Sequence, residues 1–148
     1  MNIQNIMTLF DRDLKKLKLE IESYKNENKI WEIDKGINNS AGNLCLHLIG
    51  NLNTYVGLAL GKIAYVRNRE LEFSAKNVAK AALLAQIEAT RKLVQTSLSQ
   101  LTSNDLEQEF PMLVFDKPTS TEYMLIHLTT HLAYHLGQIN YHRRLFED

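Results

Sequence analysis

The stretch TSTEYMLIHLTTHLAYHLGQINYHRRLF, residues 119–146, decides the fold of this chain. It contains four of the chain's five histidines, His127, His131, His135 and His142. The first three are spaced by four residues, so on an α-helix they lie on one face, about one turn apart. At roughly 100° per residue, the same face also takes in Met124, Leu128, Tyr134, Gln138 and Leu145. We interpret this face as the core-facing stripe of an amphipathic helix.

Three more helices are predicted upstream of this one. Apolar residues at alternating steps of three and four predict a long helix over residues 3–24. A second helix is expected to begin near Asn39 or Ser40, both good N-cap residues, and to fade around residues 61–66. A third is expected to run from an N-cap at Ser74 to about residue 101. Thr119 and Glu122 together form a capping-box pattern for the last helix.

Long connections are expected between these helices. Residues 67–73, RNRELEF, are predicted to form a charged connection. Residues 110–115 are an apolar extended run that forms either a short pair of strands or a lid over one end of the molecule. Only two prolines and six glycines occur in the 148 residues, as in chains with long helices. The predicted fold is all-α: a four-helix bundle with long connecting loops, in one domain over residues 1–148.

Composition argues against several classes of protein. Lys and Arg number 17, as do Asp and Glu, so the basic excess typical of nucleic-acid binders is absent. No apolar run is long enough to span a membrane, and the N-terminus lacks a signal-peptide layout. The single cysteine, Cys45, cannot form an internal disulfide, which fits a reducing compartment. We expect a cytoplasmic protein with neither a nucleic-acid nor a membrane partner.

The histidine spacing points to a metal site. Two histidines at i and i+4 place both imidazoles on one side of a helix, close enough to share an ion. His131 with His135 fits this geometry, and so does His127 with His131. All three do not fit together, because His127 and His135 are separated by about 12 Å of helix rise. His142 lies further away and is expected on the surface or at the end of the bundle.

A third ligand must come from another helix, and His47 is the only histidine elsewhere. It lies in the apolar seam of the second helix, with Asn43 and Asn51 one turn to either side. Polar side chains in a buried stripe are costly unless something satisfies them. Three neutral imidazoles with further positions open would make a catalytic type of metal site. Asn51, Tyr134 and Gln138 are candidates to orient the imidazoles or hold bound water.

The alternative is that these histidines are hydrogen-bonded core residues, since a HxxxH pattern is short and often arises by chance. Arg91, in the stripe of the third helix, also has two interpretations. It either meets an anionic group of a substrate or extends to solvent at an end of the bundle.

The closing HLAYHLGQI, residues 131–139, resembles the last-helix signature of the DinB-like (YfiT-like) superfamily of metalloenzymes. NSAGNLCLHLIGNL (residues 39–52), RNRELEF (67–73) and SLSQLTSNDLEQEF (97–110) are similar to a branch of that superfamily whose function is uncharacterised. The resemblance covers most of the chain from Asn39 onward, in order. Many relatives carry an arginine before the glycine of this signature, where this chain has Leu136.

This resemblance implies a four-helix bundle that holds one divalent transition metal, zinc or nickel, on three histidines. The ligand of the second helix falls on His47 and the pair of the last helix on His131 and His135. His127 then lies one turn away as a neighbour. Homodimers are common among relatives, and residues 110–115 offer apolar contacts for such a pair.

The resemblance also implies a function. Some relatives are thiol-dependent transferases that use low-molecular-weight thiols, and others are suspected hydrolases. We therefore expect a metal-dependent enzyme, a thiol-dependent transferase or a hydrolase, acting on a small molecule. No carboxylate stands on the histidine stripe to act as a general base, which mildly favours thiol chemistry. Cys45 points away from His47 and is not expected to be the nucleophile.

The alternative function is a non-catalytic, metal-binding stress-response protein. An open space beside the three histidines would favour an enzyme. A site plugged by residues 110–115 or by Tyr134 would favour the non-catalytic alternative.

Overall fold

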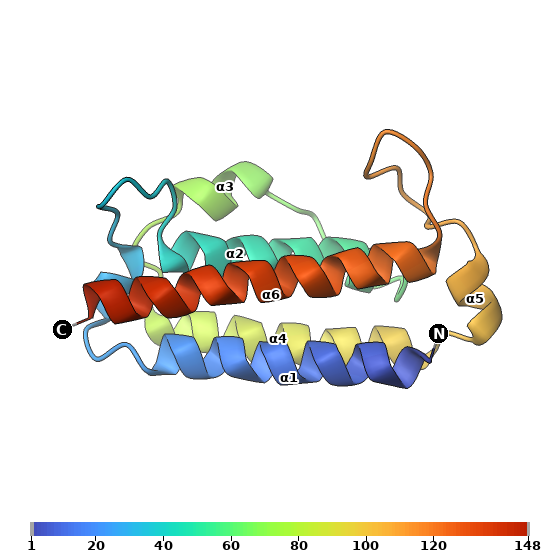
Figure 1. Ribbon diagram of the computed structural model, residues 1–148, viewed down its shortest axis with the longest axis horizontal. Helices are drawn as coiled ribbons and strands as arrows, with labels where there is room; N and C mark the ends of the chain where they lie inside the picture. The colour runs from blue at the N-terminus through green and yellow to red at the C-terminus, as the bar shows by residue number, and fades with distance from the viewer. Residues whose placement is uncertain (1, 148) are drawn as a thin grey trace.

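The computed structural model describes residues 2–147, and within them the chain is all-α, as predicted. Its helices are α1 (Ile3–Glu22), α2 (Ala41–Leu52), α3 (Arg69–Ser74), α4 (Lys80–Ser99), α5 (Ser103–Glu107) and α6 (Thr121–Phe146). A short 3₁₀ helix, η1 (Glu27–Trp31), precedes α2, and a π-helical segment, η2 (Asn53–Leu58), continues it. Figure 1 shows α1, α2, α4 and α6 lengthwise beside one another, with α3 and α5 outside them. No described helix is both long and apolar enough to cross a membrane.

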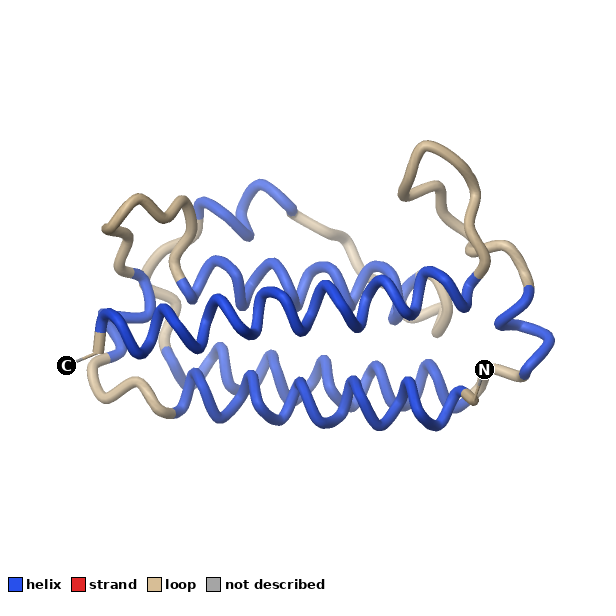
Figure 2. Tube along the Cα trace, in the orientation of Figure 1, coloured by secondary structure: helices blue, strands red, loops and turns tan. Residues whose placement is uncertain are grey.

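The core lies between these four long helices. Helix α1 packs on α4 and α6, and α2 packs on α4 and α6. The tube in Figure 2 shows how the remaining segments gather as loops and short helices at the ends and along one side. The apolar seam predicted for residues 3–24 is confirmed, because its members after Ile3 are buried: Ile6, Phe10, Leu14, Leu17 and Ile21 in α1, and Tyr24 just beyond it.

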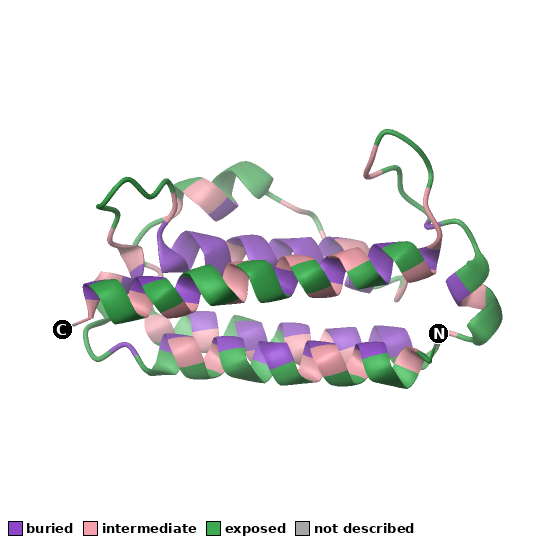
Figure 3. Cartoon of the chain, viewed as in Figure 1, coloured by how far each residue is buried: buried purple, intermediate pink, exposed green. Residues whose placement is uncertain are grey.

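Helix α2 is buried on almost every side, unlike the outer helices, whose faces alternate between buried and exposed (Figure 3). Trp31 of η1 covers its first turn, where Gly42 has no side chain: a Cβ there would lie 2.6 Å from the indole ring. The outer side of α2 is covered by α3. Because η1 and α3 cover it, α2 is enclosed on its outer side and is not a surface helix.

Helix α3 is a correction to the sequence analysis, which assigned RNRELEF to a connection. Asn68 caps this helix by accepting a hydrogen bond from the Leu71 amide, and Asn43 of α2 holds its far end. Six residues are too few to show a helical period, so the pattern was missed. The predicted N-cap Ser74 is instead the last residue of α3, and α4 begins at Lys80.

The segment before α6 also differs from the prediction. Residues 110–115 form neither strands nor helix, and α5 lies within the connection that precedes them. The Phe110 amide donates to the Thr119 carbonyl (2.8 Å), within an isolated bridge between Glu109 and Ser120. The N-cap of α6 is Ser120 rather than the predicted Thr119: the Ser120 hydroxyl accepts a hydrogen bond from the Tyr123 amide.

The orientation of α6 corrects the predicted stripe. Its buried face is centred on leucines, so the histidine face lies at the edge of the core. Tyr134 (66% exposed) and Leu145 (53%) point to solvent, and Gln138 is also exposed. Burial of an apolar side chain is more favourable than burial of an imidazole, so the helix turns its apolar face toward the core. Four apolar side chains form this face. They are Leu125, Leu128, Leu132 and Ile139.

Candidate metal centre

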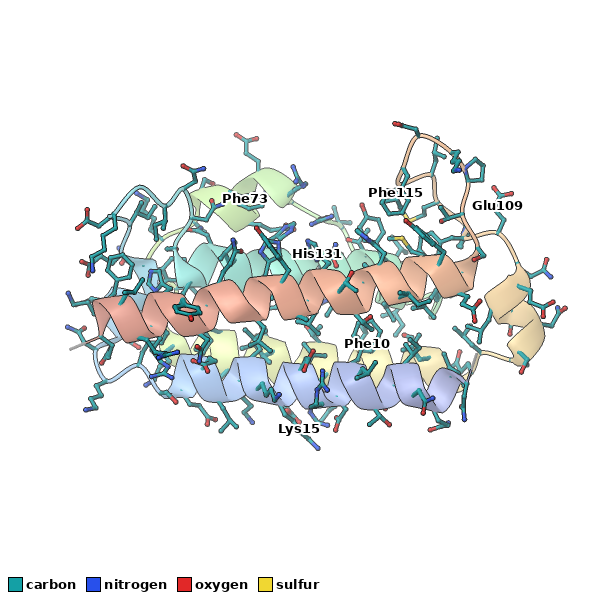
Figure 4. All side chains as sticks on the ribbon, in the orientation of Figure 1. Phe10, Lys15, Phe73, Glu109, Phe115 and His131 are labelled. Atoms are coloured by element: carbon teal, nitrogen blue, oxygen red, sulfur yellow. The ribbon has the colours of Figure 1, made fainter. Side chains whose placement is uncertain are left out.

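Three imidazoles from two helices meet at one point. One ring nitrogen from each of His47, His131 and His135 lies within 4.8 Å of the other two. The Nε2 atoms of His47 and His131 are 3.2 Å apart, and the rings of His131 and His135 are 4.6 Å apart between centroids. Figure 4 shows His131 on the same side of α6 as Phe73 of α3. The convergence of α2 and α6 therefore assembles the cluster that the histidine spacing suggested.

The outer nitrogens of two of these rings are held by acceptors. The Nδ1 atom of His47 lies 3.1 Å from Oε1 of Glu72, and Nδ1 of His135 lies 2.7 Å from Oε1 of Gln138. Because a carboxylate and an amide oxygen only accept, both Nδ1 atoms carry hydrogen. Both Nε2 atoms then keep a lone pair. Nδ1 of His131 is buried without a partner among the described residues.

The donor set fits a divalent transition metal. Nε2 of His47, which keeps its lone pair, lies 3.2 Å from Nε2 of His131, a separation that two ligands of one cation can have. Tetrahedral zinc, with Zn–N bonds of about 2.0–2.1 Å, places its nitrogen ligands roughly 3.3 Å apart. His47, His131 and His135 would supply three ligands, which leaves positions for water or substrate.

Burial favours the neutral form of two of these imidazoles, His47 and His131. It lowers the pKa of His131 to about 4, with further lowering from the neighbouring His135 and His47. Burial also lowers the pKa of His47, although the hydrogen bond that His47 donates to Glu72 opposes this shift. Neutral imidazole is the form that binds metal, so neither ring has to lose a proton at pH 7.

Glu72 and Arg67 contact the cluster, and the sequence analysis did not single them out. Arg67 binds the Glu72 carboxylate through two nitrogens, Nε to Oε2 at 2.8 Å and Nη2 to Oε1 at 2.9 Å. Glu72 is only 6% exposed, although it belongs to a highly charged segment. It reaches His47 from a separate short helix, so no spacing along α2 or α6 reveals it.

The other candidate residues surround the cluster in different ways. The Tyr134 ring lies beside that of His135, 5.3 Å between centroids, and Asn51 is buried with its Oδ1 unpartnered among described residues. His127 lies against His131 on one side and the Phe115 ring on the other, outside the cluster. His142 is buried at the end of the bundle, so the surface alternative for this residue is wrong.

A groove of about 490 Å³ borders the cluster at His135. Its walls are the C-terminal half of α6 and the loop that leads into α2. Within residues 2–147, no Asp, Glu, Lys or Arg lines it; the lining is Gly36, Ile37, Asn38, Asn39, Leu44, Tyr134, His135, Gln138, Tyr141, His142, Leu145 and Phe146. Phe110 is buried against Tyr55, and Phe115 packs on Tyr123 and His127, so residues 110–115 do not line this groove.

Two further side chains are accounted for within the protein. Arg91 forms ion pairs with Glu88 and Asp11, both at 2.6 Å, so it has no need of an anionic substrate group. Cys45 is fully buried, and burial raises the pKa of its thiol to about 12. Neither residue takes part in the site.

Comparison with protein families matches residues 3–148 to the model of a family described as "Protein of unknown function (DUF1572)". Comparison with curated proteins finds no match.

Proposed function

The chain belongs to the DUF1572 family, whose function is unknown, and we propose from its site that it is a metal-dependent enzyme acting on a small molecule. His47, His131 and His135 would hold one divalent transition metal, zinc or nickel, in a single-domain four-helix bundle of the DinB-like type. The observation that carries the proposal is the convergence of three imidazole nitrogens within 4.8 Å beside an open groove.

A metal at this point would act as a Lewis acid that lowers the pKa of a water or a thiol. The protein's own residues supply the rest of the site. Gln138 holds His135 by its Nδ1–H, and the groove beside His135 gives a small molecule access to the cluster. Its lining of amides, phenols and apolar side chains suits an uncharged substrate body.

Thiol-dependent transfer is favoured over hydrolysis assisted by a carboxylate base. The carboxylate that contacts the cluster, Glu72, is bound by Arg67 and by His47 on the side away from His131. A carboxylate held in this way is not free to take a proton from water in the groove. A thiol whose pKa is lowered needs no such base.

The non-catalytic alternative is less well supported. Tyr134 is exposed beside His135 rather than covering it, and residues 110–115 pack elsewhere. Within residues 110–115, the Leu113 side chain is 71% exposed and could contact a second copy of the chain. Homodimer formation through this loop stays a prediction.

Metal analysis of protein purified without a histidine tag tests the proposal. We expect about one equivalent of metal in wild type and in His127→Ala, and loss of metal in His131→Ala and His135→Ala. His127 is the matched control, since it lies on the same helix one turn away. Equal metal content in all four proteins, or none in wild type, would contradict the assignment.

Activity is tested by screening metal-loaded protein with low-molecular-weight thiols and electrophilic small molecules. Turnover should depend on metal and disappear in His131→Ala. A fully loaded protein without turnover on any thiol or hydrolysable substrate would support the non-catalytic alternative.

A further inference from the structure

We infer that Glu72, clamped by Arg67, is a positioning residue that fixes the tautomer and direction of His47 for metal binding. The inference rests on the proposed metal site. It adds an element, α3, whose role is to hold a carboxylate behind one ligand.

The backbone of α3 is fixed to α2 next to His47. Asn43, one turn before His47, donates from Nδ2 to the carbonyls of Glu72 (3.0 Å) and Ala75 (2.8 Å). The Phe73 ring lies 4.9 Å from the His47 ring between centroids. These contacts fix the position of the Glu72 backbone relative to His47.

The Glu72 carboxylate is then held from both sides. Its Oε1 receives His47 Nδ1–H and Arg67 Nη2, and its Oε2 receives Arg67 Nε. A buried carboxylate is stable only when it is paired and hydrogen-bonded, and Arg67 meets both needs. Nη2 of Arg67 also lies 3.4 Å from Nδ1 of His47, a contact between two donors that the carboxylate makes tolerable.

Gly50 makes room for this carboxylate. It lies three residues after His47 on α2, and a Cβ there would overlap Oε2 of Glu72. An ion pair between Arg67 and Glu72 alone could sit anywhere on the surface. This ion pair instead lies behind His47, in space that Gly50 leaves free, where Glu72 contacts the imidazole. This placement indicates that the ion pair serves to position His47.

The consequence concerns the other nitrogen of His47. A carboxylate that accepts from Nδ1–H keeps the lone pair on Nε2, directed at His131, and makes that nitrogen more basic. Outer partners of this kind typically change metal affinity about 10–100-fold.

The first experiment compares Zn²⁺ dissociation constants, measured by competition with a chromogenic chelator. Glu72→Gln should raise the constant about 10–100-fold relative to wild type. Gly50→Ala should also raise it, because the new methyl group displaces the carboxylate. Glu70→Gln, the same change at an exposed position of α3, should leave it unchanged. The Co²⁺ absorption spectrum should shift in the first two variants only.

The second experiment measures the tautomer of His47 in the wild-type protein itself. In metal-free wild type, ¹⁵N spectra of the histidine side chains should show His47 with hydrogen on Nδ1, assigned by its loss in His47→Gln. Hydrogen on Nε2 would overturn the inference.

The outcomes separate this inference from the proposed function. Wild type that binds Zn²⁺ together with a Glu72→Gln variant of equal affinity would overturn the role of Glu72 alone. Wild type that does not bind Zn²⁺ would overturn the metal site, and the positioning role with it.

Discussion

At the scale of single residues, the imidazoles of α6 differ in how completely they are hydrogen-bonded. His142 has both ring nitrogens satisfied inside the protein, by the Tyr24 hydroxyl at 2.6 Å and the Glu32 carbonyl at 2.8 Å. His131 has one nitrogen 3.2 Å from another imidazole and the other unpartnered among the described residues. Full satisfaction marks a structural histidine. The incomplete pairing of His131 distinguishes it from His142 and fits a role as a metal ligand.

His142 leads to a prediction about pH. The carbonyl of Glu32 only accepts, so Nε2 carries hydrogen and Nδ1 accepts from Tyr24. Burial lowers the pKa of His142 below 6.5, so the unfolded chain binds more protons than the native one as pH falls through that value. Its contribution to stability is present above pH 6.5 and lost below it. Between pH 7.5 and 5.5, metal-free wild type should lose more unfolding free energy in urea than His142→Gln; equal losses would contradict this account.

Cys45 leads to a prediction about reactivity. Its thiol is fully buried and its pKa is raised to about 12, so the thiolate is scarce and inaccessible in the native state. A chromogenic disulfide reagent at pH 8 should label it only as fast as the protein unfolds. Rapid labelling without denaturant would show that α2 opens readily.

At the scale of elements, α2 depends on two short neighbours. Trp31 of η1 covers Gly42, and α3 lies over the side that carries Asn43, His47 and Gly50. Each glycine of α2 leaves room for a large side chain from one of these neighbours. The small residues in this helix are therefore explained by what packs on them.

Two glycine substitutions test this packing. Gly42→Ala should destabilise the protein by about 1–3 kcal/mol, because its Cβ would lie 2.6 Å from the Trp31 ring. Gly137 is at an exposed position of α6, where an added Cβ would meet nothing within 4 Å. Gly137→Ala should therefore stabilise the protein by roughly 0.5–1 kcal/mol. Chemical denaturation of both variants measures the difference, and a Gly42→Ala protein as stable as wild type would show that the indole moves freely.

At the scale of the whole molecule, the candidate metal site joins two helices that are distant in sequence. His47 lies on α2 and His131 on α6, so a shared ion would cross-link the bundle. A ligand that binds only the native state stabilises it by mass action.

Metal should therefore raise the thermal stability of the wild-type protein. At a free concentration 100-fold above the dissociation constant, Zn²⁺ adds about 2.7 kcal/mol, which corresponds to a rise in Tm of roughly 5–10 °C for a chain of this size. Calorimetry with and without a chelator measures the shift. His131→Ala should show almost none, and a similar shift in that variant would point to binding elsewhere.

The features that depend on local periodicity could be predicted from the sequence. The helical period placed the four long helices, and a spacing of four residues put His131 and His135 on one face, because both follow from the 3.6-residue turn. His47 was predicted as their partner because it is the only histidine outside residues 119–146. The resemblance to other proteins then favoured His131 and His135 over His127, since no local rule says which helices touch.

How these helices face each other depends on tertiary packing and could not be predicted from local patterns. Competition for burial turned the leucines of α6 inward and left His127, His131 and His135 at the edge of the core, with His135 next to the groove. Glu72 reached His47 because α3 folded onto α2, a contact between segments 25 residues apart. Such contacts depend on which surfaces meet, and six residues of helix carry no period from which to predict them.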